Sequence, residues 1–207
     1  MFYTNWGEDA GSTSYMCFYP EQIKYIDNKQ PTRSKKMKEG ISKQQEEFFK
    51  DSKIRRRRDG SLIICTHCSD EDFETFDVDR IGSGSGGVNG YGFYFTSHET
   101  NDNGYGKNAY KCYLNITNPF IFTDDPNEII ELCEQCGYKL DQKDIDFALS
   151  EFDKYEEDYQ TSIDDLLNGN VKLFTKMIKD CGYDGIWSMP YDEVIAFYPN
   201  QIKRISN

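Results

Sequence analysis

The stretch from Gly82 to Gly92 has the composition of a loop that approaches a ligand closely. Six of its eleven positions are Gly, and a glycine backbone reaches positive φ angles and puts no side chain between itself and a bound molecule. The loop differs from the two common nucleotide-binding loops: no Gly-Lys-Ser/Thr ends it, and an aromatic run follows where a helix would begin. The same composition also fits a flexible hairpin loop that precedes a core strand.

Two Cys-x-x-Cys pairs could bind Zn²⁺. Cys65 and Cys68 flank His67, and Cys133 and Cys136 form the second pair. The 64 residues between the pairs exceed by far the roughly 15 to 20 of common zinc modules. A structural or nucleic-acid-binding zinc module is therefore an alternative rather than the main hypothesis.

Four residues of other kinds follow one another in a characteristic order. His67, one of only two His, comes after an apolar run, Tyr94 lies in Gly-Phe-Tyr-Phe-Thr, Tyr105 follows eleven residues later, and Glu193 begins the last apolar run. Taken singly, either tyrosine fits a core position and the glutamate fits an exposed strand. As a set they resemble the His-Tyr-Glu class of ADP-ribosyltransferases, the class of diphtheria toxin and the poly(ADP-ribose) polymerases.

Further motifs are similar to the ADP-ribosyltransferase domains of phage and mobile-element polyvalent proteins. They are Phe73-Glu-Thr-Phe-Asp77, Ile81-Gly-Ser-Gly84, Leu114-Asn-Ile-Thr-Asn-Pro-Phe120, Gly182-Tyr-Asp-Gly-Ile186 and Phe197-Tyr-Pro-Asn-Gln-Ile202. The similarity extends over about residues 60 to 205, and the ordered set is more specific than any one motif.

The resemblance implies a reaction on NAD⁺, used as co-substrate without a metal. Breaking the bond between nicotinamide and ribose passes through an oxocarbenium-like state, which needs aromatic faces for the flat cation and an anion beside the ribose. It implies that Tyr94 and Tyr105 enclose the nicotinamide, that His67 hydrogen-bonds a ribose hydroxyl, and that Glu193 stabilises the positive charge and orients or deprotonates the acceptor. Five further positions are expected to contact NAD⁺: Gly82, Gly84, Cys68, Ser69 and Thr96.

The function this resemblance implies is mono-ADP-ribosylation of a host macromolecule, protein or nucleic acid, by a toxin-like phage or mobile-element effector in the host cytoplasm. A NAD⁺ glycohydrolase and a catalytically inactive NAD⁺-binding module are the alternatives. Two departures from the family bear on this. Cys68 stands where Gly usually follows the His, and Tyr191 stands where arginine-modifying relatives carry a second Glu. The second departure leaves the acceptor open.

The elements that must position these residues alternate between strands and helices. Expected strands cover residues 61–65, with His67 just past the end, then 91–96, 110–116, an edge piece at 120–122, and finally 185–188 and 193–198. Expected helices run from a cap at Asp125-Pro126 to Cys133, from Lys143 to about Asp158, and from Ser162 or Asp164 to about Asp180, with Gly182 after the end. The sequence therefore predicts an α+β fold of split, mainly antiparallel sheets with a helical insertion.

The charge distribution indicates where the main domain begins. Residues 29–59 carry twelve Lys/Arg against five Asp/Glu, whereas residues 60–207 carry eleven against twenty-seven. We expect residues 31–59 to be a basic linker that contains a short helix over 41–53 anchored by Phe48 and Phe49, and residues 60–207 to be the catalytic domain. The run Arg55–Arg58 fits a solvated linker, or a strap lying on the acidic domain, better than a nucleic-acid patch in a chain of net charge −12.

The two ends of the chain share a repeat. Phe18–Ile26 matches Phe197–Ile205 at seven of nine positions, and the alignment sets Ser14 opposite Glu193. Residues 1–30 are therefore interpreted as a duplicated end-strand segment without the acid, either the tail of a preceding related domain or a duplicated strand that has lost its chemistry. We expect this segment to dock on an exposed sheet edge or apolar patch of the 60–207 domain.

Composition limits the setting. Aromatic residues make up 15%, well above disordered chains, so the chain is expected to fold around Tyr and Phe. Seven Cys is an odd number, and the sequence contains neither a secretion-signal pattern nor an apolar run long enough for a membrane span. We therefore expect a reducing compartment and no membrane partner; the oligomeric state is not indicated.

Overall fold

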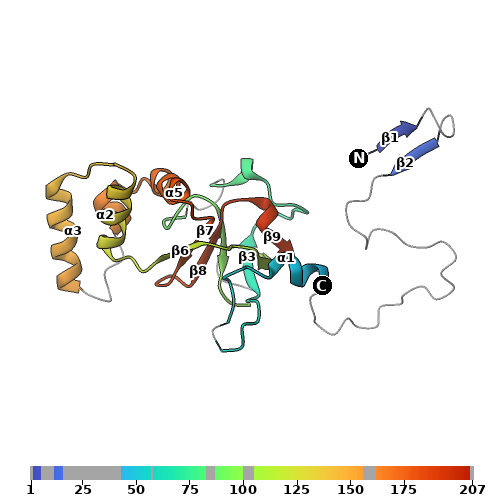
Figure 1. Ribbon diagram of the computed structural model, residues 1–207, viewed down its shortest axis with the longest axis horizontal. Helices are drawn as coiled ribbons and strands as arrows, with labels where there is room; N and C mark the ends of the chain where they lie inside the picture. The colour runs from blue at the N-terminus through green and yellow to red at the C-terminus, as the bar shows by residue number, and fades with distance from the viewer. Residues whose placement is uncertain are drawn as a thin grey trace. The chain divides into compact units, whose positions relative to one another are not determined.

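The computed structural model describes residues 2–5, 12–15, 43–56, 58–82, 87–99, 105–155 and 162–205. The chain divides into two units, Met1–Ser42 and Lys43–Asn207 (Figure 1). In the first unit, β1 (Phe2–Asn5) and β2 (Ser12–Tyr15) pair antiparallel, and Ser14 lies opposite Tyr3. The repeated segment at residues 18–26 lies outside the described residues.

The larger unit is built on a seven-stranded sheet in the order β6-β7-β8-β4-β3-β5-β9. Its strands are β3 (Cys65–Ser69), β4 (Phe93–Thr96), β5 (Asn108–Leu114), β6 (Pro119–Phe122), β7 (Gly185–Ser188), β8 (Glu193–Ala196) and β9 (Ile202–Arg204). All neighbours are antiparallel except β6 and β7. The predicted α+β class is confirmed, and the β6 segment is an edge strand as expected.

Five α-helices belong to the described part of this unit: α1 (Lys43–Phe49), α2 (Pro126–Gln135), α3 (Gln142–Tyr155), α4 (Ser162–Leu167) and α5 (Val171–Asp180). α2 begins as predicted, with the Asp125 side chain accepting from the Asn127 backbone N–H. α2, α3 and α5 gather at the end of the unit beyond β6 and β7 (Figure 1). Among the described residues, no helix is long and apolar enough to cross a membrane.

The single helix expected up to Asp180 is wrong, because the chain breaks it into α4 and α5. Asn168 and Gly169 adopt positive φ angles of 51° and 67°, which end α4. The Asn170 side chain then accepts from the Leu173 N–H and starts α5. Asn and Gly are the residues that tolerate this left-handed turn most easily, so Asn168-Gly169-Asn170 acts as stop and start signal together.

The strand expected over residues 61–65 is also misplaced, since β3 runs over Cys65–Ser69 and holds His67 at its middle. Residues 54–56 and 61–63 instead pair with each other: Ile63 donates its N–H to Ile54, and Leu62 forms a β-bridge with Arg55. The run of apolar residues before Cys65 thus serves a local turn, and the sheet begins where the chain meets β5.

The helix expected over residues 41–53 is shorter, and only one of its two phenylalanines is an anchor. Phe49 is fully buried, whereas Phe48 is 48% exposed. Arg55 is not a solvated linker residue: its guanidinium donates to the backbone carbonyls of Phe49, Ser52 and Gly60. The segment from residue 43 onward therefore lies with the larger unit.

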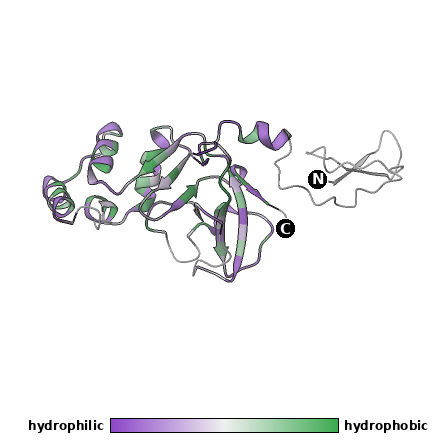
Figure 2. Ribbon diagram, turned by 90° about the horizontal axis from the view of Figure 1, so that it is seen from below, coloured by the Kyte–Doolittle hydropathy of each residue, from purple (hydrophilic) through white to green (hydrophobic). Residues whose placement is uncertain are grey.

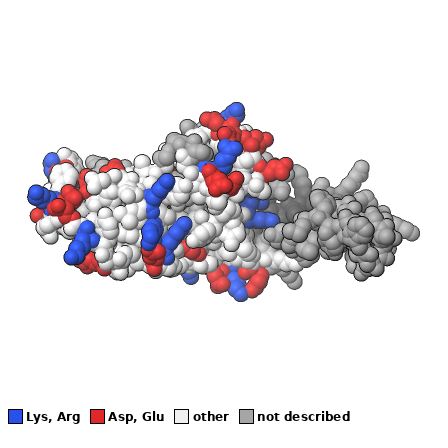
Figure 3. Space-filling model, turned by 90° about the horizontal axis from the view of Figure 1, so that it is seen from above, with Lys and Arg blue, Asp and Glu red and all other residues white. Residues whose placement is uncertain are grey.

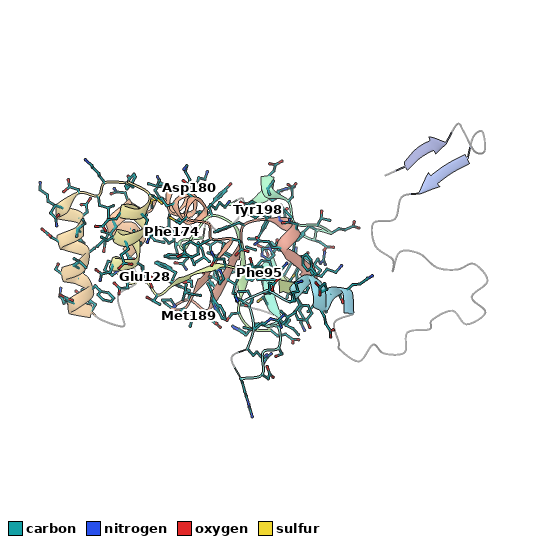
Figure 4. The ribbon with its side chains drawn as sticks, in the orientation of Figure 1. Phe95, Glu128, Phe174, Asp180, Met189 and Tyr198 are labelled. Atoms are coloured by element: carbon teal, nitrogen blue, oxygen red, sulfur yellow. The ribbon has the colours of Figure 1, made fainter. Side chains whose placement is uncertain are left out.

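The core occupies both faces of the sheet, and strand alternation assigns residues to each. The helix-side cluster includes Ile129, Phe174, Ile186 and Ile195, and the opposite cluster includes Phe93, Phe95, Cys112, Leu114 and Val194. Phe174 and Phe95 mark the two clusters in Figure 4. In Figure 2 both the helices and the longest strand alternate between green and purple along their length. Phe93 and Phe95 lie on one side of β4 and Tyr94 on the other, because successive side chains of a strand point to opposite faces.

Candidate active site

The junction between β3 and β4 is where the site residues meet. These strands share one residue pair, Thr66 with Thr96. One residue further along β3, His67 Nδ1 lies 2.8 Å from the Tyr94 carbonyl oxygen. Because a carbonyl only accepts, Nδ1 carries the proton and Nε2 is left as an acceptor. The His67 side chain thus links β3 to β4 beyond the single backbone pair of these strands, and the bond fixes the imidazole tautomer.

The imidazole of His67 is held in an aromatic environment. The rings of Phe73, Phe76 and Phe95 have centroids 5.8, 5.1 and 5.6 Å from that of His67. This burial lowers the pKa of His67 from its ordinary value, against the opposing effect of the bond to the Tyr94 carbonyl. The imidazole is therefore neutral near pH 7, with an acceptor nitrogen rather than a cation to offer a ligand.

Tyr94 is fixed by the glycine-rich loop. Its hydroxyl donates to the Gly90 carbonyl at 2.6 Å and accepts the Asn89 backbone N–H at 3.1 Å. At Gly87 a Cβ atom would stand only 1.8 Å from Cζ of the Tyr94 ring, so only glycine lets the loop pass there. Burial raises the pKa of Tyr94 well above its usual range, which keeps the phenol neutral.

Glu193 opens β8 on the same face as Tyr94. It pairs with Thr96 of β4 on one side and Ser188 of β7 on the other. Its carboxylate is partly buried, and Oε2 accepts from Asn89 Nδ2 at 3.0 Å. Burial raises the pKa of Glu193, while the Asn89 bond works in the opposite direction.

Alternation along the sheet separates His67 from the other two side chains. His67 is the register partner of Tyr110, which lies in the cluster of Phe93 and Phe95, whereas Tyr94 and Glu193 lie on the helix side. The three residues nevertheless converge on one short stretch of β4: His67 on the Tyr94 carbonyl, and Glu193 beside Thr96.

Two candidate NAD⁺ contacts lie at the end of β3, together with Tyr105. Cys68 is partly exposed, and the Ser69 hydroxyl accepts from the Glu71 N–H. Gly106 packs so tightly on this end that a Cβ atom there would stand 2.3 Å from the Ser69 carbonyl carbon. Tyr105 is thereby brought next to β3, with its side chain 64% exposed.

The remaining candidates are less closely grouped. Thr96 donates its hydroxyl to the His98 carbonyl at 3.1 Å. Gly82 has φ +78° and approaches the Tyr91 ring, and Gly84 lies outside the described residues. Residues in Gly82–Gly92 that the structure describes therefore serve both Tyr94 and the end of β4.

Asn89 is the site residue that sequence reasoning missed. It is 2% exposed and contacts Tyr94 through its backbone and Glu193 through its side chain. In the sequence, Asn89-Gly90 within a glycine run has the character of a turn, and nothing local connects it to a glutamate 104 residues away. A buried Asn in a loop becomes informative only when its partner is known.

The two Cys-x-x-Cys pairs do not form one site. Cys65 belongs to the cluster of Phe93 and Phe95, and Cys133 belongs to the helix-side cluster, where its thiol donates to Met177. Cys136 lies instead 3.2 Å from Cys181, sulfur to sulfur. Within the described ranges, no group of three or more His, Cys, Asp or Glu is arranged to hold a metal ion. Cys65 and Cys133 thus lie in two different core clusters, which gives the two pairs no common position for a metal ion among the described residues.

Comparison with known families agrees with this geometry. Residues 57–207 match the family model described as ADP-ribosyltransferase in polyvalent proteins. The chain belongs to this family. The match covers all seven strands of the main sheet, and with them His67, Tyr94 and Glu193. No curated protein and no solved structure matched the chain. The resemblance predicted from ordered motifs is thus confirmed, and the larger unit is an ADP-ribosyltransferase domain.

Proposed function

We propose that the protein transfers one ADP-ribose unit from NAD⁺ to a host macromolecule, a protein or nucleic acid, as an effector in the host cytoplasm. The observation that carries this proposal is the convergence of His67, Tyr94 and Glu193 on one stretch of β4. These residues are far apart in the sequence and come from three different strands. A purely structural sheet has no need for a neutral imidazole on one face of a strand junction and a buried phenol and a partly buried carboxylate on the other.

The site residues fit the parts of NAD⁺ in charge and hydrogen bonding. The acceptor Nε2 of His67 suits a ribose hydroxyl, which donates. The exposed Tyr105 ring and the fixed Tyr94 ring suit the flat nicotinamide cation, which stacks on aromatic faces. The glycine loop beside them allows a dinucleotide to approach the backbone.

In the proposed reaction, the chain's residues act on charge that develops as the nicotinamide leaves. Glu193 stabilises the positive charge at the anomeric carbon, and it accepts a proton or a hydrogen bond from the incoming acceptor. Nicotinamide leaves with the bonding electron pair and becomes neutral, and the acceptor oxygen, nitrogen or sulfur forms the new bond to the ribose. His67 and Tyr94 orient the ribose and ring and take no proton in this scheme.

The acceptor is the open part of the proposal. Tyr191 stands two residues before Glu193 and donates its hydroxyl toward Asp124 at 3.5 Å. It provides no second carboxylate of the arginine-modifying kind. On the face of the larger unit shown in Figure 3, acidic and basic side chains are intermingled, so this face presents no single-sign surface for a nucleic acid.

Incubation with isotope-labelled NAD⁺ and host-cell lysate, with and without RNase, tests the proposal. Label in protein or RNA that depends on an intact Glu193 supports a transferase and identifies the acceptor class. Label released only as free ADP-ribose indicates the NAD⁺ glycohydrolase alternative. Binding of NAD⁺ without any turnover, measured by calorimetry, indicates an inactive binding module and contradicts the enzyme.

A further inference from the structure

We propose that Asn89 is a positioning residue for the reaction, because its side-chain amide holds the Glu193 carboxylate while its backbone N–H holds the Tyr94 hydroxyl. This inference rests on the function proposed above. The two contacts measure 3.0 Å and 3.1 Å, and both are made by one residue that is 2% exposed. The carboxylate accepts only, so the amide nitrogen must be the atom that faces it. Asn89 therefore connects two of the three proposed site residues.

The loop around Asn89 is anchored to the sheet and to α5. The Tyr91 N–H donates to the Thr175 hydroxyl of α5 at 2.7 Å. Gly90 has φ +150° and packs so closely that a Cβ atom would stand 2.6 Å from Ile186 Cδ1. Gly92 lies equally close to the Ala196 carbonyl, with a Cβ separation of 2.6 Å. These contacts fix the backbone on the C-terminal side of Asn89, so the side chain that reaches Glu193 is attached to a rigid part of the loop.

Two phenols are the titratable side chains that interact with the Glu193 carboxylate among the described residues, while the neighbouring Asp192 carboxylate accepts from Ser97 and contacts His98 instead. Tyr94 of β4 and Tyr191 of the β7–β8 turn are the titratable groups that interact with it electrostatically. Burial raises the pKa of Tyr94 above its usual range and that of Tyr191 to about 12, so neither phenol carries a charge near pH 7. On β7, its register partner is Ser188, which cannot ionise. Among the described residues, Asn89 is the one side chain that donates a hydrogen bond to this carboxylate.

An amide suits this position better than a cation would. A Lys or Arg would neutralise the negative charge that the oxocarbenium-like state requires. An amide donor orients the carboxylate and favours its ionised form while leaving its full charge for the ribose. Asn89 thus offsets the burial of Glu193 without reducing what the carboxylate contributes to the reaction.

The experiment compares three variants of the full chain with wild type. Asn89→Ala removes the donor, and Asn89→Asp keeps the shape and the backbone bond to Tyr94 but turns the donor into an acceptor. Asn170→Ala is the matched control, because it removes an Asn side chain that caps α5 and has no contact with Glu193. The readouts are kcat and KM for NAD⁺ as functions of pH, and the pKa of Glu193 from carboxyl-carbon NMR of labelled protein.

If Asn89 positions Glu193 for the reaction, Asn89→Ala lowers kcat about 10- to 100-fold, which is the range expected for one hydrogen bond to a charged group. KM for NAD⁺ stays within a few-fold of wild type. The acidic limb of the pH profile and the NMR pKa of Glu193 both move upward, further in Asn89→Asp than in Asn89→Ala. Asn170→Ala lowers the melting temperature and leaves both pH readouts unchanged. An Asn89 that only supports the fold would lower the melting temperature and leave kcat unchanged, even if the NMR pKa of Glu193 moves.

Wild-type kcat and an unmoved Glu193 pKa in folded Asn89→Ala would overturn the inference. The proposed function is tested separately, by Glu193→Gln. If Glu193→Gln turns over NAD⁺ normally, the site assignment fails. If Glu193→Gln is inactive and Asn89→Ala is fully active, only the positioning by Asn89 fails. If wild type does not turn over NAD⁺, both the proposed function and the positioning role of Asn89 are wrong, whatever pKa the NMR titration gives for Glu193.

Discussion

Replacing Glu193 with Gln tests the chemistry with the least change in structure. Gln has nearly the same shape, and its side-chain oxygen can still accept from Asn89 Nδ2, which lies 3.0 Å from Glu193 Oε2 in the wild type. What the substitution removes is the negative charge. A carboxylate about 4 Å from the developing positive charge contributes about 4 kcal/mol at an effective dielectric constant of about 20. We therefore expect transfer to fall about 1000-fold, with NAD⁺ affinity within several-fold of wild type.

The same substitution should not lower stability. Burial raises the pKa of Glu193 above its ordinary value, so folding disfavours the ionised form more than the Asn89 bond favours it. The carboxylate therefore costs stability at pH values above its folded pKa, and this cost disappears as the pH falls through that pKa. Since Gln is neutral, the variant should melt at the same temperature as wild type or higher at pH 7, and the difference should vanish near pH 4.

The assay measures label transfer, NAD⁺ binding by calorimetry and melting temperature on the same preparations. Loss of transfer with intact binding and undiminished melting temperature is the expected result. Wild-type transfer rates in Glu193→Gln would refute the assignment of Glu193. A large fall in melting temperature at pH 7 would refute the argument that the buried carboxylate costs stability.

Three further outcomes follow from the structure. Tyr94→Ala should lose about 3 kcal/mol of stability as well as NAD⁺ affinity, because the Tyr94 ring is buried and its hydroxyl makes two hydrogen bonds. Tyr105→Ala should lose roughly 0.5–2 kcal/mol of NAD⁺ affinity with little change in melting temperature, because the Tyr105 ring is exposed. Equal falls in melting temperature with intact NAD⁺ affinity would contradict this. A chain that begins at residue 43 should keep NAD⁺ turnover per folded molecule. A chain that begins at residue 60 should melt at a lower temperature, because it lacks the buried Phe49 of α1. Equal melting temperatures for the two chains would contradict the packing of α1 on this unit. Mild disulfide oxidants should form a Cys136–Cys181 disulfide before any disulfide that involves a cysteine of the sheet, because the two sulfur atoms lie 3.2 Å apart. The reaction should be faster at high pH, because burial raises the pKa of Cys136 to about 11. Peptide mapping that finds another disulfide first would disprove this prediction.

Local sequence was sufficient where the stabilising interaction is itself local. The alternation of Phe93, Tyr94 and Phe95 gave the two faces of β4, because side chains of a strand point in turn to opposite sides. Asp125-Pro126 marked the start of α2, because a carboxylate cap and a proline in the first turn act within a few residues. The ordered motifs indicated the family, which the match over residues 57–207 confirms.

Local sequence failed where a competing partner decided the outcome. The apolar residues before Cys65 were expected to begin the strand, but residues 54–56 and 61–63 pair with each other and delay it. Phe48 and Phe49 have the same propensities, yet only the second points into the core. The break at Asn168-Gly169 had a local signal, but the helical pattern on both sides concealed it.

The candidate site shows the same division. The types of His67, Tyr94 and Glu193, and their order, could be taken from the sequence alone. Their geometry could not: the link from His67 to the Tyr94 carbonyl arises because the β3–β4 ladder ends after one pair, and the bond from Asn89 to Glu193 spans 104 residues. Such contacts depend on the order in which strands from distant parts of the chain are arranged in one sheet. The residues next to a given position in the sequence do not indicate that strand order. The sequence determined the chemical groups of the site, and the tertiary structure decided which of them meet, because hydrogen bonding and burial act through space rather than along the chain.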